Sequence, residues 1–183
     1  HGSTLVSLGV ARHAGKGETV IGNAAGRVLA EIRTVATILS KAGFDTKISK
    51  DIDSVIWSKL IVNVGINALS AITRLPNGAL AEHEETKAVM RAAVQEAVKI
   101  AKRKRIKLAY DDAFQKVEGV CRATAENISS MLQDVINKKR TEIDFINGAI
   151  VRQGKTLGIP TPANEVLTNL VKTIESSYKK SVI

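Results

Sequence analysis

The sequence predicts a mainly α-helical protein in which a helical domain follows a small β-containing segment. Three observations predict this fold class. Aromatic residues are only 3% of the 183 residues, so the core must be built from Leu, Ile, Val and Ala, and Ala and Leu favour helix. From Arg27 onward, apolar residues recur at spacings of three and four, as on one face of a helix. Residues 1–25 instead contain two short apolar runs around a glycine-rich turn, which is typical of strands.

The first apolar runs, residues 4–11 and 18–21, are expected to form a hairpin around a turn at residues 13–17. Two short strands cannot bury a sheet by themselves, so we interpret them as the end of a domain that begins upstream. An alternating stretch at residues 44–48 is a further candidate strand. The sequence therefore predicts a β remnant over residues 1–46 and a helical domain over residues 47–183.

The helical domain is expected to contain a series of helices with recognisable ends. Asp51 or Asp53 can cap a long helix that runs to Thr73, and Thr141-Glu142-Ile143-Asp144 has the pattern of a capping box. Gly158-Ile159-Pro160-Thr161-Pro162 predicts an extended turn, because proline biases the preceding residue away from helix. We expect helices, in order, from residue 27 to 43, 51 or 53 to 73, 82 or 84 to 105, 111 or 112 to 122, 127 to 137, 141 to 154 or 157, and 162 to 178.

The composition restricts the classes of protein to which this chain can belong. Hydrophobic residues are 44% and charged residues 25%, as in a soluble globular protein. There is no uninterrupted run of about 18 apolar residues, and the first residues lack the pattern of a signal peptide. The single cysteine, Cys121, allows no internal disulfide, so we expect a cytoplasmic protein with a buried, inert thiol.

The net charge of +9 could serve nucleic acid, anionic lipid or an anionic small substrate. The densest basic run, residues 102–107, falls in a helical pattern that spreads its side chains around the axis, and no aromatic residues interleave with it. We interpret this run as a solvated helix end and expect neither a nucleic-acid partner nor a membrane partner. An anionic small substrate remains compatible with the charge.

Common catalytic and metal-binding motifs are absent from the sequence. No GxGxxG follows a candidate strand, and Gly15-Lys16-Gly17 fits a turn better than a phosphate-binding loop. The three histidines are far apart and lack the spacing of metal ligands. We therefore expect no metal site.

Two groups of polar residues break the local patterns. Lys59, Asn63 and Asn67 are four residues apart, so they share one face of a helix whose other faces are apolar. Asparagine is a poor residue for a helix interior, so this group is a candidate site, although by pattern alone a solvent-facing or helix-bridging polar stripe is the favoured explanation.

The second group comprises Asn127, Ser130 and Glu142. Asn127 and Ser130 are one helical turn apart, and Glu142 is expected in the first turn of the next helix, where the helix dipole favours a carboxylate. Helix capping by Glu142 and Asp144 is the competing explanation of the acidic residues.

These groups, with the residues around them, resemble ketopantoate reductase. Four blocks occur in the order of that family: WSKLIVNVGINALSA (57–71), TAENISSMLQD (124–134), KRTEIDFING (139–148) and GIPTP (158–162). The first residues, with RHAG (12–15) and TVIG (19–22), are similar to the end of the family's N-terminal domain. The resemblance covers essentially the whole chain.

The resemblance implies a two-domain enzyme that reduces 2-dehydropantoate (ketopantoate) to pantoate, on the route to pantothenate and coenzyme A. An N-terminal Rossmann domain would bind NADPH, and a helical C-terminal domain similar to that of 6-phosphogluconate dehydrogenase would bind the substrate. The family's glycine-rich loop, and an asparagine that it contributes to the active site, should lie upstream of His1. We therefore expect this polypeptide to be a fragment that is inactive alone.

The family's roles carry over by position. Lys59 matches the general acid that protonates the keto oxygen, and Glu142 matches a catalytic carboxylate that also makes a candidate contact to the cofactor. Asn63 and Asn67 match residues that orient the lysine and the substrate. Ser130 matches a hydroxyl that binds the substrate carboxylate, and Asn127 lies beside it as a further substrate-binding candidate.

Two alternatives remain open from the sequence. One is a non-enzymatic helical module for dimerisation or for binding an acidic partner, which would fit the basic surface. The other is a related reductase of a different 2-keto acid. A homodimer through the helical domain and a choice of NADPH over NADH are expectations that the residues themselves do not test.

Overall fold

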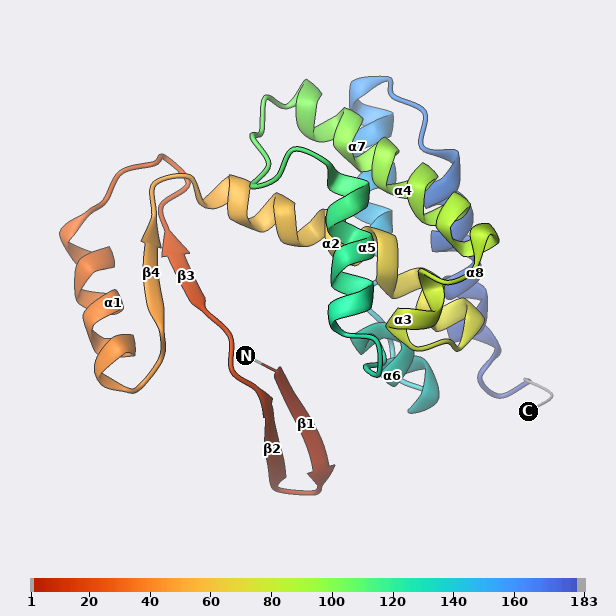
Figure 1. The fold of residues 1–183 in the computed structure, drawn as a ribbon, viewed down its shortest axis with the longest axis horizontal. Coiled ribbons are helices and arrows are strands. Elements are labelled where there is room, and N and C mark those ends of the chain that lie inside the picture. The colour runs from red at the N-terminus through yellow and green to blue at the C-terminus, as the bar shows by residue number, and fades with distance from the viewer. Residues whose placement is uncertain (1, 181–183) are drawn as a thin grey trace. The chain divides into compact units, whose positions relative to one another are not determined.

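The structure is a computed structural model that describes residues 2–180, and it is mainly helical with a small β part near the N-terminus (Figure 1). The predicted fold class is confirmed. The chain divides into two compact units, one up to Ile56 and one from Trp57 onward. The division falls within a helix, ten residues after the boundary expected from the sequence, and each unit is described separately.

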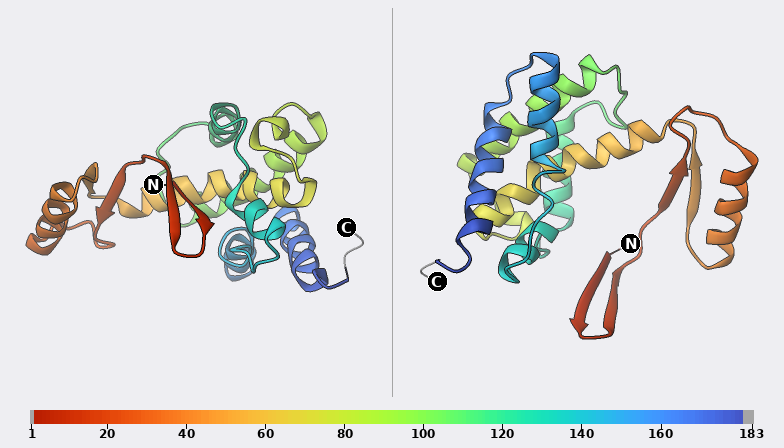
Figure 2. Two further views of the ribbon diagram at one scale, coloured as in Figure 1. Left: turned by 90° about the horizontal axis from the view of Figure 1, so that it is seen from below. Right: turned by 180° about the vertical axis from the view of Figure 1, so that it is seen from behind.

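The first unit contains two separate two-stranded sheets. Strands β1 (Gly2–Ser7) and β2 (Val10–Gly15) form an antiparallel hairpin. Strand β3 (Thr19–Gly22) pairs in parallel with β4 (Thr46–Ser49), with Val20 opposite Lys47. Helix α1 (Ala30–Lys41) connects β3 to β4 and contacts both of these strands (Figure 2).

The predicted hairpin between residues 4–11 and 18–21 is wrong. The chain reverses earlier, at Gly9, whose φ of 79° is readily adopted only by glycine. Residues 13–15 therefore belong to β2 and not to a turn, and β3 pairs with β4 instead of with the first strand. Parallel pairing requires a crossover connection, and α1 provides it. The candidate strand at residues 44–48 is confirmed as β4, shifted by one or two residues.

The second unit is a helical bundle built around α2 (Ile52–Thr73), which begins in the first unit. Asp51 caps α2, because its Oδ1 accepts a hydrogen bond of 3.0 Å from the backbone N–H of Ser54. The remaining helices are α3 (Asn77–Leu80), α4 (Glu84–Arg103), α5 (Ala113–Ala123), α6 (Ser130–Ile136), α7 (Asn147–Leu157) and α8 (Pro162–Ser177).

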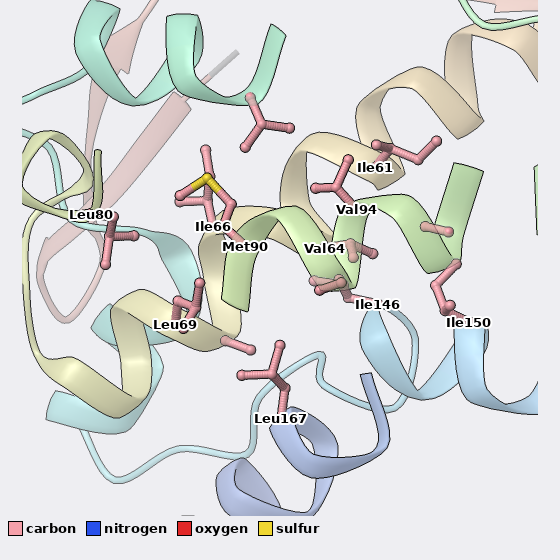
Figure 3. Packing of buried hydrophobic residues seen from close by; sticks show 14 of the residues in the cluster. Ile61, Val64, Ile66, Leu69, Leu80, Met90, Val94, Ile146, Ile150 and Leu167 are labelled. Carbon is pink, nitrogen blue, oxygen red and sulfur yellow. The ribbon is translucent and has the colours of Figure 1, made fainter. Parts of the chain in front are cut away.

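The core of this unit is continuous across several helices. Helices α4, α7 and α8 contact one another, and α7 and α8 lie side by side in both views of Figure 2. Figure 3 shows how α2 contributes Ile61, Val64, Ile66 and Leu69 to a cluster completed by residues of its neighbours: Leu80, Met90, Val94, Ile146, Ile150 and Leu167. Burial of these aliphatic side chains is the main source of stability for the bundle.

Helix α2 is apolar enough to cross a membrane when it is judged by length and composition alone, with a mean hydropathy of 1.6. Lys59 and two asparagines interrupt its apolar residues, so the sequence contains no uninterrupted apolar run of that length. However, 56% of that segment is buried inside the protein, and Ile61 and Val64 are fully buried. Helix α2 is therefore the core helix of the bundle.

Helices α1, α6 and α7 begin later than the sequence predicts, α1 at Ala30 and not at residue 27. Helix α6 begins at Ser130, and Ser129 caps it by accepting a bond of 3.0 Å from the N–H of Leu132, so Asn127 precedes the helix. Helix α7 begins at Asn147 and not at Thr141. The Thr141 hydroxyl instead accepts a bond from Ile143 two residues away, which closes a local turn and leaves no helix to cap.

Candidate functional site

The first group of predicted site residues lies along one face of α2. Successive members differ by about 40° around the helix axis, so Lys59, Asn63 and Asn67 lie within an arc of about 80°. Lys59 is exposed, Asn63 is half-buried and Asn67 is only 7% exposed. The group therefore leads from the surface of the second unit toward its interior.

None of these three side chains forms a hydrogen bond or ion pair with another residue of the described range 2–180. A solvent-facing stripe does not explain Asn67, because it is buried, and a helix-bridging stripe would have partners. Buried amides normally have hydrogen-bond partners. The α2 group is thus an unpaired set of one cation and two amides, which suits the binding of a small polar ligand.

The N-terminal part of α2 is held in place next to Lys59. The hydroxyl of Ser58 accepts a bond of 2.9 Å from the N–H of Ala109, and the carbonyl of Ser58 accepts one of 2.9 Å from the hydroxyl of Tyr110. Desolvation by burial raises the pKa of Tyr110 to about 12, so this phenol stays a donor at neutral pH. These bonds fix the turn of α2 from which the Lys59 side chain extends.

The second group begins in the segment before α6. Asn127 is exposed, and its carbonyl accepts a bond of 2.9 Å from the N–H of Asn77. The N–H of Gly78 donates to Ala125 at 3.1 Å, and a Cβ atom on Gly78 would lie 2.7 Å from the Cβ atom of Ala125. The start of α3 therefore holds this segment closely, and a glycine is required for that approach.

Ser130 is exposed as the first residue of α6, because Ser129 supplies the cap. The side chains of Asn127 and Ser130 have no hydrogen-bond partner among the residues that the structure describes. Both remain available to an external ligand.

Glu142 lies in a turn before α7 and not in the first turn of a helix as predicted. Its carbonyl accepts bonds from Phe145 at 2.9 Å and from Ile146 at 3.1 Å. The N-cap of α7 is Ile146, which makes no side-chain capping bond, so the capping explanation of Glu142 is wrong. The Glu142 carboxylate is exposed and has no ion-pair partner within residues 2–180.

Asp144, the other acidic residue of the predicted capping box, has a different role. Its carboxylate contacts the ammonium of Lys172 at 2.6 Å and the guanidinium of Arg140 at 3.6 Å. The hydrogen bond from Lys172, more than any other contact, lowers the pKa of Asp144 below its ordinary value. Asp144 thus ties the turn to α8, while Glu142 stays free.

All six predicted side chains belong to the second unit, and they come from α2, the start of α6 and the turn before α7. A direct bond joins two of these places, since Nδ2 of Asn147 donates to the carbonyl of Val64 at 3.1 Å. The convergence of all six around one ligand stays a prediction.

The sequence analysis missed a group of buried polar residues beside this site. Asn147, Asn164 and Glu96 form a hydrogen-bonded network in the interior, and Asn77 is buried at the start of α3. Two side-chain oxygens, Oδ1 of Asn77 and Oδ1 of Asn147, are fully enclosed without a partner within the described range. The available signal was the pair of Asn-Gly sequences at 77–78 and 147–148.

The described residues offer no place for a metal ion or for a dinucleotide. No group of three or more His, Cys, Asp or Glu side chains comes together within them. Strand β3 is followed by Asn23-Ala24-Ala25-Gly26, without the GxGxxG loop that cradles a pyrophosphate, and α1 has no polar cap residue. These residues therefore do not fit a nicotinamide cofactor on their own.

Comparison with known proteins decides the family. A family model described as ketopantoate reductase PanE/ApbA C terminal matches residues 51–175, which is more than half of the chain. The chain belongs to the ketopantoate reductase family. The resemblance inferred from the four sequence blocks is confirmed, and the matched region contains all six predicted site residues of this ketopantoate reductase domain.

Curated relatives agree with this assignment. The chain is 41% identical to a 2-dehydropantoate 2-reductase of Archaeoglobus fulgidus over 96% of its own length and 59% of that protein. It is 37% identical to the enzyme of the same name from Vibrio cholerae over 99% of its length and 60% of that protein. The chain thus spans about three fifths of the length of these relatives.

Solved structures resemble the chain closely. A PanE/ApbA family ketopantoate reductase from Ralstonia eutropha aligns with a TM-score of 0.89 at 38% identity, covering 97% of this chain and 58% of that one. A D-mandelate dehydrogenase in complex with NADH aligns with a TM-score of 0.86 at 30% identity, covering 96% of this chain and 60% of that one. The ketopantoate reductase fold is therefore shared with a dehydrogenase named for a different 2-hydroxy acid.

Proposed function

We propose that this chain supplies the substrate-binding and proton-donating part of an NADPH-dependent 2-dehydropantoate 2-reductase. That enzyme converts ketopantoate to pantoate in the cytoplasmic synthesis of pantothenate and coenzyme A. One observation carries the proposal: none of the six polar side chains at the positions of the family motifs has a hydrogen-bond or ion-pair partner among residues 2–180. Polar side chains left unpaired beside a well-packed core are typical of residues that bind a ligand.

Lys59 is the proposed general acid. Reduction of a ketone adds hydride to the carbonyl carbon and develops negative charge on the oxygen. An ammonium group at hydrogen-bond distance stabilises that charge and then donates a proton to it, which yields the alcohol. The exposed position of Lys59 on a firmly held turn of α2 suits this role.

The other five side chains bind and orient the substrate in this proposal. Asn63 and Asn67 supply amides that orient the lysine and the substrate hydroxyl from the same face of α2. The Ser130 hydroxyl binds the substrate carboxylate, and Asn127 contributes beside it. Glu142 provides a carboxylate that hydrogen-bonds the substrate in this proposal.

The hydride comes from a nicotinamide cofactor, which a further domain of the natural protein would bind. Supporting this, the chain spans about three fifths of its relatives and has no dinucleotide loop of its own among the described residues. We accordingly expect the isolated chain to be inactive. The natural protein is expected to bind ketopantoate and pantoate, and a homodimer through the helical domain stays a prediction.

The test uses the natural protein that includes the cofactor-binding domain, with NADPH oxidation in the presence of ketopantoate as the measurement. Lys59→Ala is expected to lower kcat by about 10²- to 10⁴-fold, because it removes the general acid. Lys116→Ala, on the exposed surface of α5, is the matched control and should leave kcat unchanged. If kcat is the same in Lys59→Ala and in the natural protein, Lys59 has no part in the mechanism.

A reductase of a different 2-keto acid is the second candidate function. Its specific support is the similarity to D-mandelate dehydrogenase, at a TM-score of 0.86. The same assay run with phenylglyoxylate, the 2-keto acid that corresponds to mandelate, distinguishes the two. A higher kcat/KM for phenylglyoxylate than for ketopantoate would favour the second candidate, and comparing NADPH with NADH in parallel would establish the cofactor.

A further inference from the structure

The buried polar network of the helical unit reaches α2 directly beside the predicted site. Asn147 is 0% exposed, and its Nδ2 donates to the carbonyl of Val64, the residue that follows Asn63. The same Nδ2 donates to Oδ1 of Asn164 at 3.0 Å. One amide group therefore links α7 to α2 and to α8.

The network continues from Asn164 to α4. Nδ2 of Asn164 donates to Oε2 of Glu96 at 2.7 Å and to the carbonyl of Ala93 at 3.0 Å. The two carboxylate oxygens of Glu96 also accept bonds from the backbone N–H groups of Ala163 and Asn164, at the start of α8. Asn147 is thus anchored directly to α2 and, through Asn164, to α8 and α4.

The orientation of the Asn147 amide is fixed by its surroundings. Nδ2 lies between two acceptors, the Val64 carbonyl and Oδ1 of Asn164, so a rotated amide would place an oxygen against two oxygens. The present orientation leaves Oδ1 enclosed without a partner in the described range, and a buried acceptor without a hydrogen bond is unfavourable for stability. A buried asparagine that leaves an acceptor unpaired is a poor choice for stability alone.

Asn147 also ends the turn that carries Glu142. The N–H of Gly148 donates to the carbonyl of Ile143 at 2.9 Å, so the turn closes directly onto the first residues of α7. At its other end, the backbone N–H of Thr141 donates to Oε1 of Glu175 at 2.6 Å. The position of Glu142 relative to α2 therefore depends on where Asn147 is held, as well as on the contacts of Thr141 and Asp144 with α8.

We propose that Asn147 is a positioning residue of the reductase reaction, whose amide sets the register between α2, which carries Lys59 and Asn63, and the turn that carries Glu142. The inference rests on the proposed function, and it adds a residue that does not itself touch the substrate. Asn147 acts through Val64 and through the turn.

The kinetic test compares three variants of the natural protein that includes the cofactor-binding domain. Asn147→Leu keeps the shape of the side chain and removes both donated bonds, and Asn147→Ser is a milder variant that can retain one of them. Thr168→Val is the matched control, because it removes a buried bond of 2.7 Å to the backbone carbonyl of Asn164 and leaves the side-chain bonds of Asn164 and Asn147 in place. NADPH oxidation with ketopantoate gives kcat and KM, and thermal melting gives stability.

Asn147→Leu is expected to lower kcat at least about tenfold, and by a larger factor than it raises KM, because it misplaces the proton donor relative to the substrate. Asn147→Ser should show a smaller loss of kcat. Thr168→Val should lower the melting temperature and leave kcat within about twofold. In a Lys59→Ala background, Asn147→Leu should cause little additional loss, since residues that act together give non-additive effects.

Hydrogen exchange provides a readout that does not depend on activity. In Asn147→Leu the amides of Phe145, Ile146 and Gly148 should exchange at least about tenfold faster, while the amide of Leu132 in α6 should not change. Thr168→Val should not change the exchange rates of these four amides.

The two proposals fail in different ways. If the natural protein reduces no 2-keto acid, the proposed function is wrong, and exchange at the turn still decides whether Asn147 positions Glu142. If the natural protein is active, a kcat in Asn147→Leu equal to that of Thr168→Val overturns the positioning role. Fully additive effects of Asn147→Leu and Lys59→Ala, or unchanged exchange at the turn, would overturn it too.

Discussion

The two compact units differ in how much of their own apolar surface they bury. In the first unit, Ala36 is the only buried hydrophobic side chain among those whose burial the structure describes, and even this residue is 9% exposed. Large apolar side chains are exposed there, among them Val6, Leu8, Val10, Leu29, Val35, Ile38, Phe44 and Ile48. In the second unit, Ile61, Leu80 and Met90 are fully buried in one continuous cluster.

The contrast shows that regular secondary structure does not by itself indicate a stable unit. The first unit has well-formed strands and a complete β-α-β connection, but its sheets have only two strands each. Sheets of that size are at best marginally stable without further packing. The second unit combines an aliphatic core with a buried hydrogen-bonded network, so it can hold side chains in defined positions. All six predicted site residues belong to it.

The largest expected effect concerns folding of the two regions separately. A polypeptide of residues 51–183 should be helical and should unfold in one cooperative transition, because it contains the aliphatic core. A polypeptide of residues 1–50 should show no cooperative transition. Circular dichroism during thermal melting measures both, and a sharp transition in the shorter polypeptide would contradict the comparison.

Truncation of an aliphatic side chain should lower the free energy of unfolding much more in the second unit than in the first. Ile61→Ala deletes part of a side chain that is 0% exposed, so it should lower the free energy of unfolding by about 2–5 kcal/mol. Ile38→Ala changes a side chain that is 60% exposed in α1 and should alter that free energy by less than about 0.5 kcal/mol. Urea titrations of both variants measure the difference, and equal losses would refute it.

Cys121 reports on the second unit alone, because it is the single cysteine of the chain and is fully buried there. Burial raises the pKa of its thiol from 9.0 to about 11. At pH 8 the folded thiol should therefore react with a disulfide reagent at least about a hundredfold more slowly than the unfolded thiol.

The same pKa shift predicts how stability depends on pH. The neutral thiol is favoured in the folded state, so its contribution is complete below pH 9 and decreases as the pH rises toward 11. Melting temperatures recorded between pH 8 and 11 should fall more steeply than those of Cys121→Ala. Parallel curves would show that Cys121 does not contribute.

The smallest expected effect concerns the ion pair of Asp144 and Lys172. Both side chains are partly exposed, so Lys172→Ala should cost less than about 1 kcal/mol. Because the pKa of Asp144 is lowered, the stabilisation should be present at neutral pH and should disappear as the pH falls through the range in which Asp144 becomes protonated. Urea titrations at neutral and acidic pH measure this, and a loss that persists when Asp144 is protonated would contradict the assignment.

Local sequence signals predicted some elements well and failed for others. The long helix after Asp51 was predictable, because the capping residue and the spacing of the apolar residues both predict a helix that begins there. The helix start at Thr141 was not, because the Thr141 hydroxyl and backbone N–H bind Ile143 and Glu175 instead of capping a helix. The first hairpin was misplaced because the reversal depends on the backbone of one residue, Gly9.

By itself, the sequence determined the helical class, the order of the family blocks and the positions of Lys59, Asn63, Asn67, Asn127, Ser130 and Glu142 within them. The tertiary structure alone decided that these side chains have no partner within the described part of the chain, that Glu142 is no helix cap, and that Asn147 bonds to Val64, 83 positions earlier. The physical reason is the distance along the chain over which each kind of interaction acts. Helix propensity, capping and periodicity act between near neighbours, whereas burial and hydrogen bonds between distant segments exist only once the chain has packed.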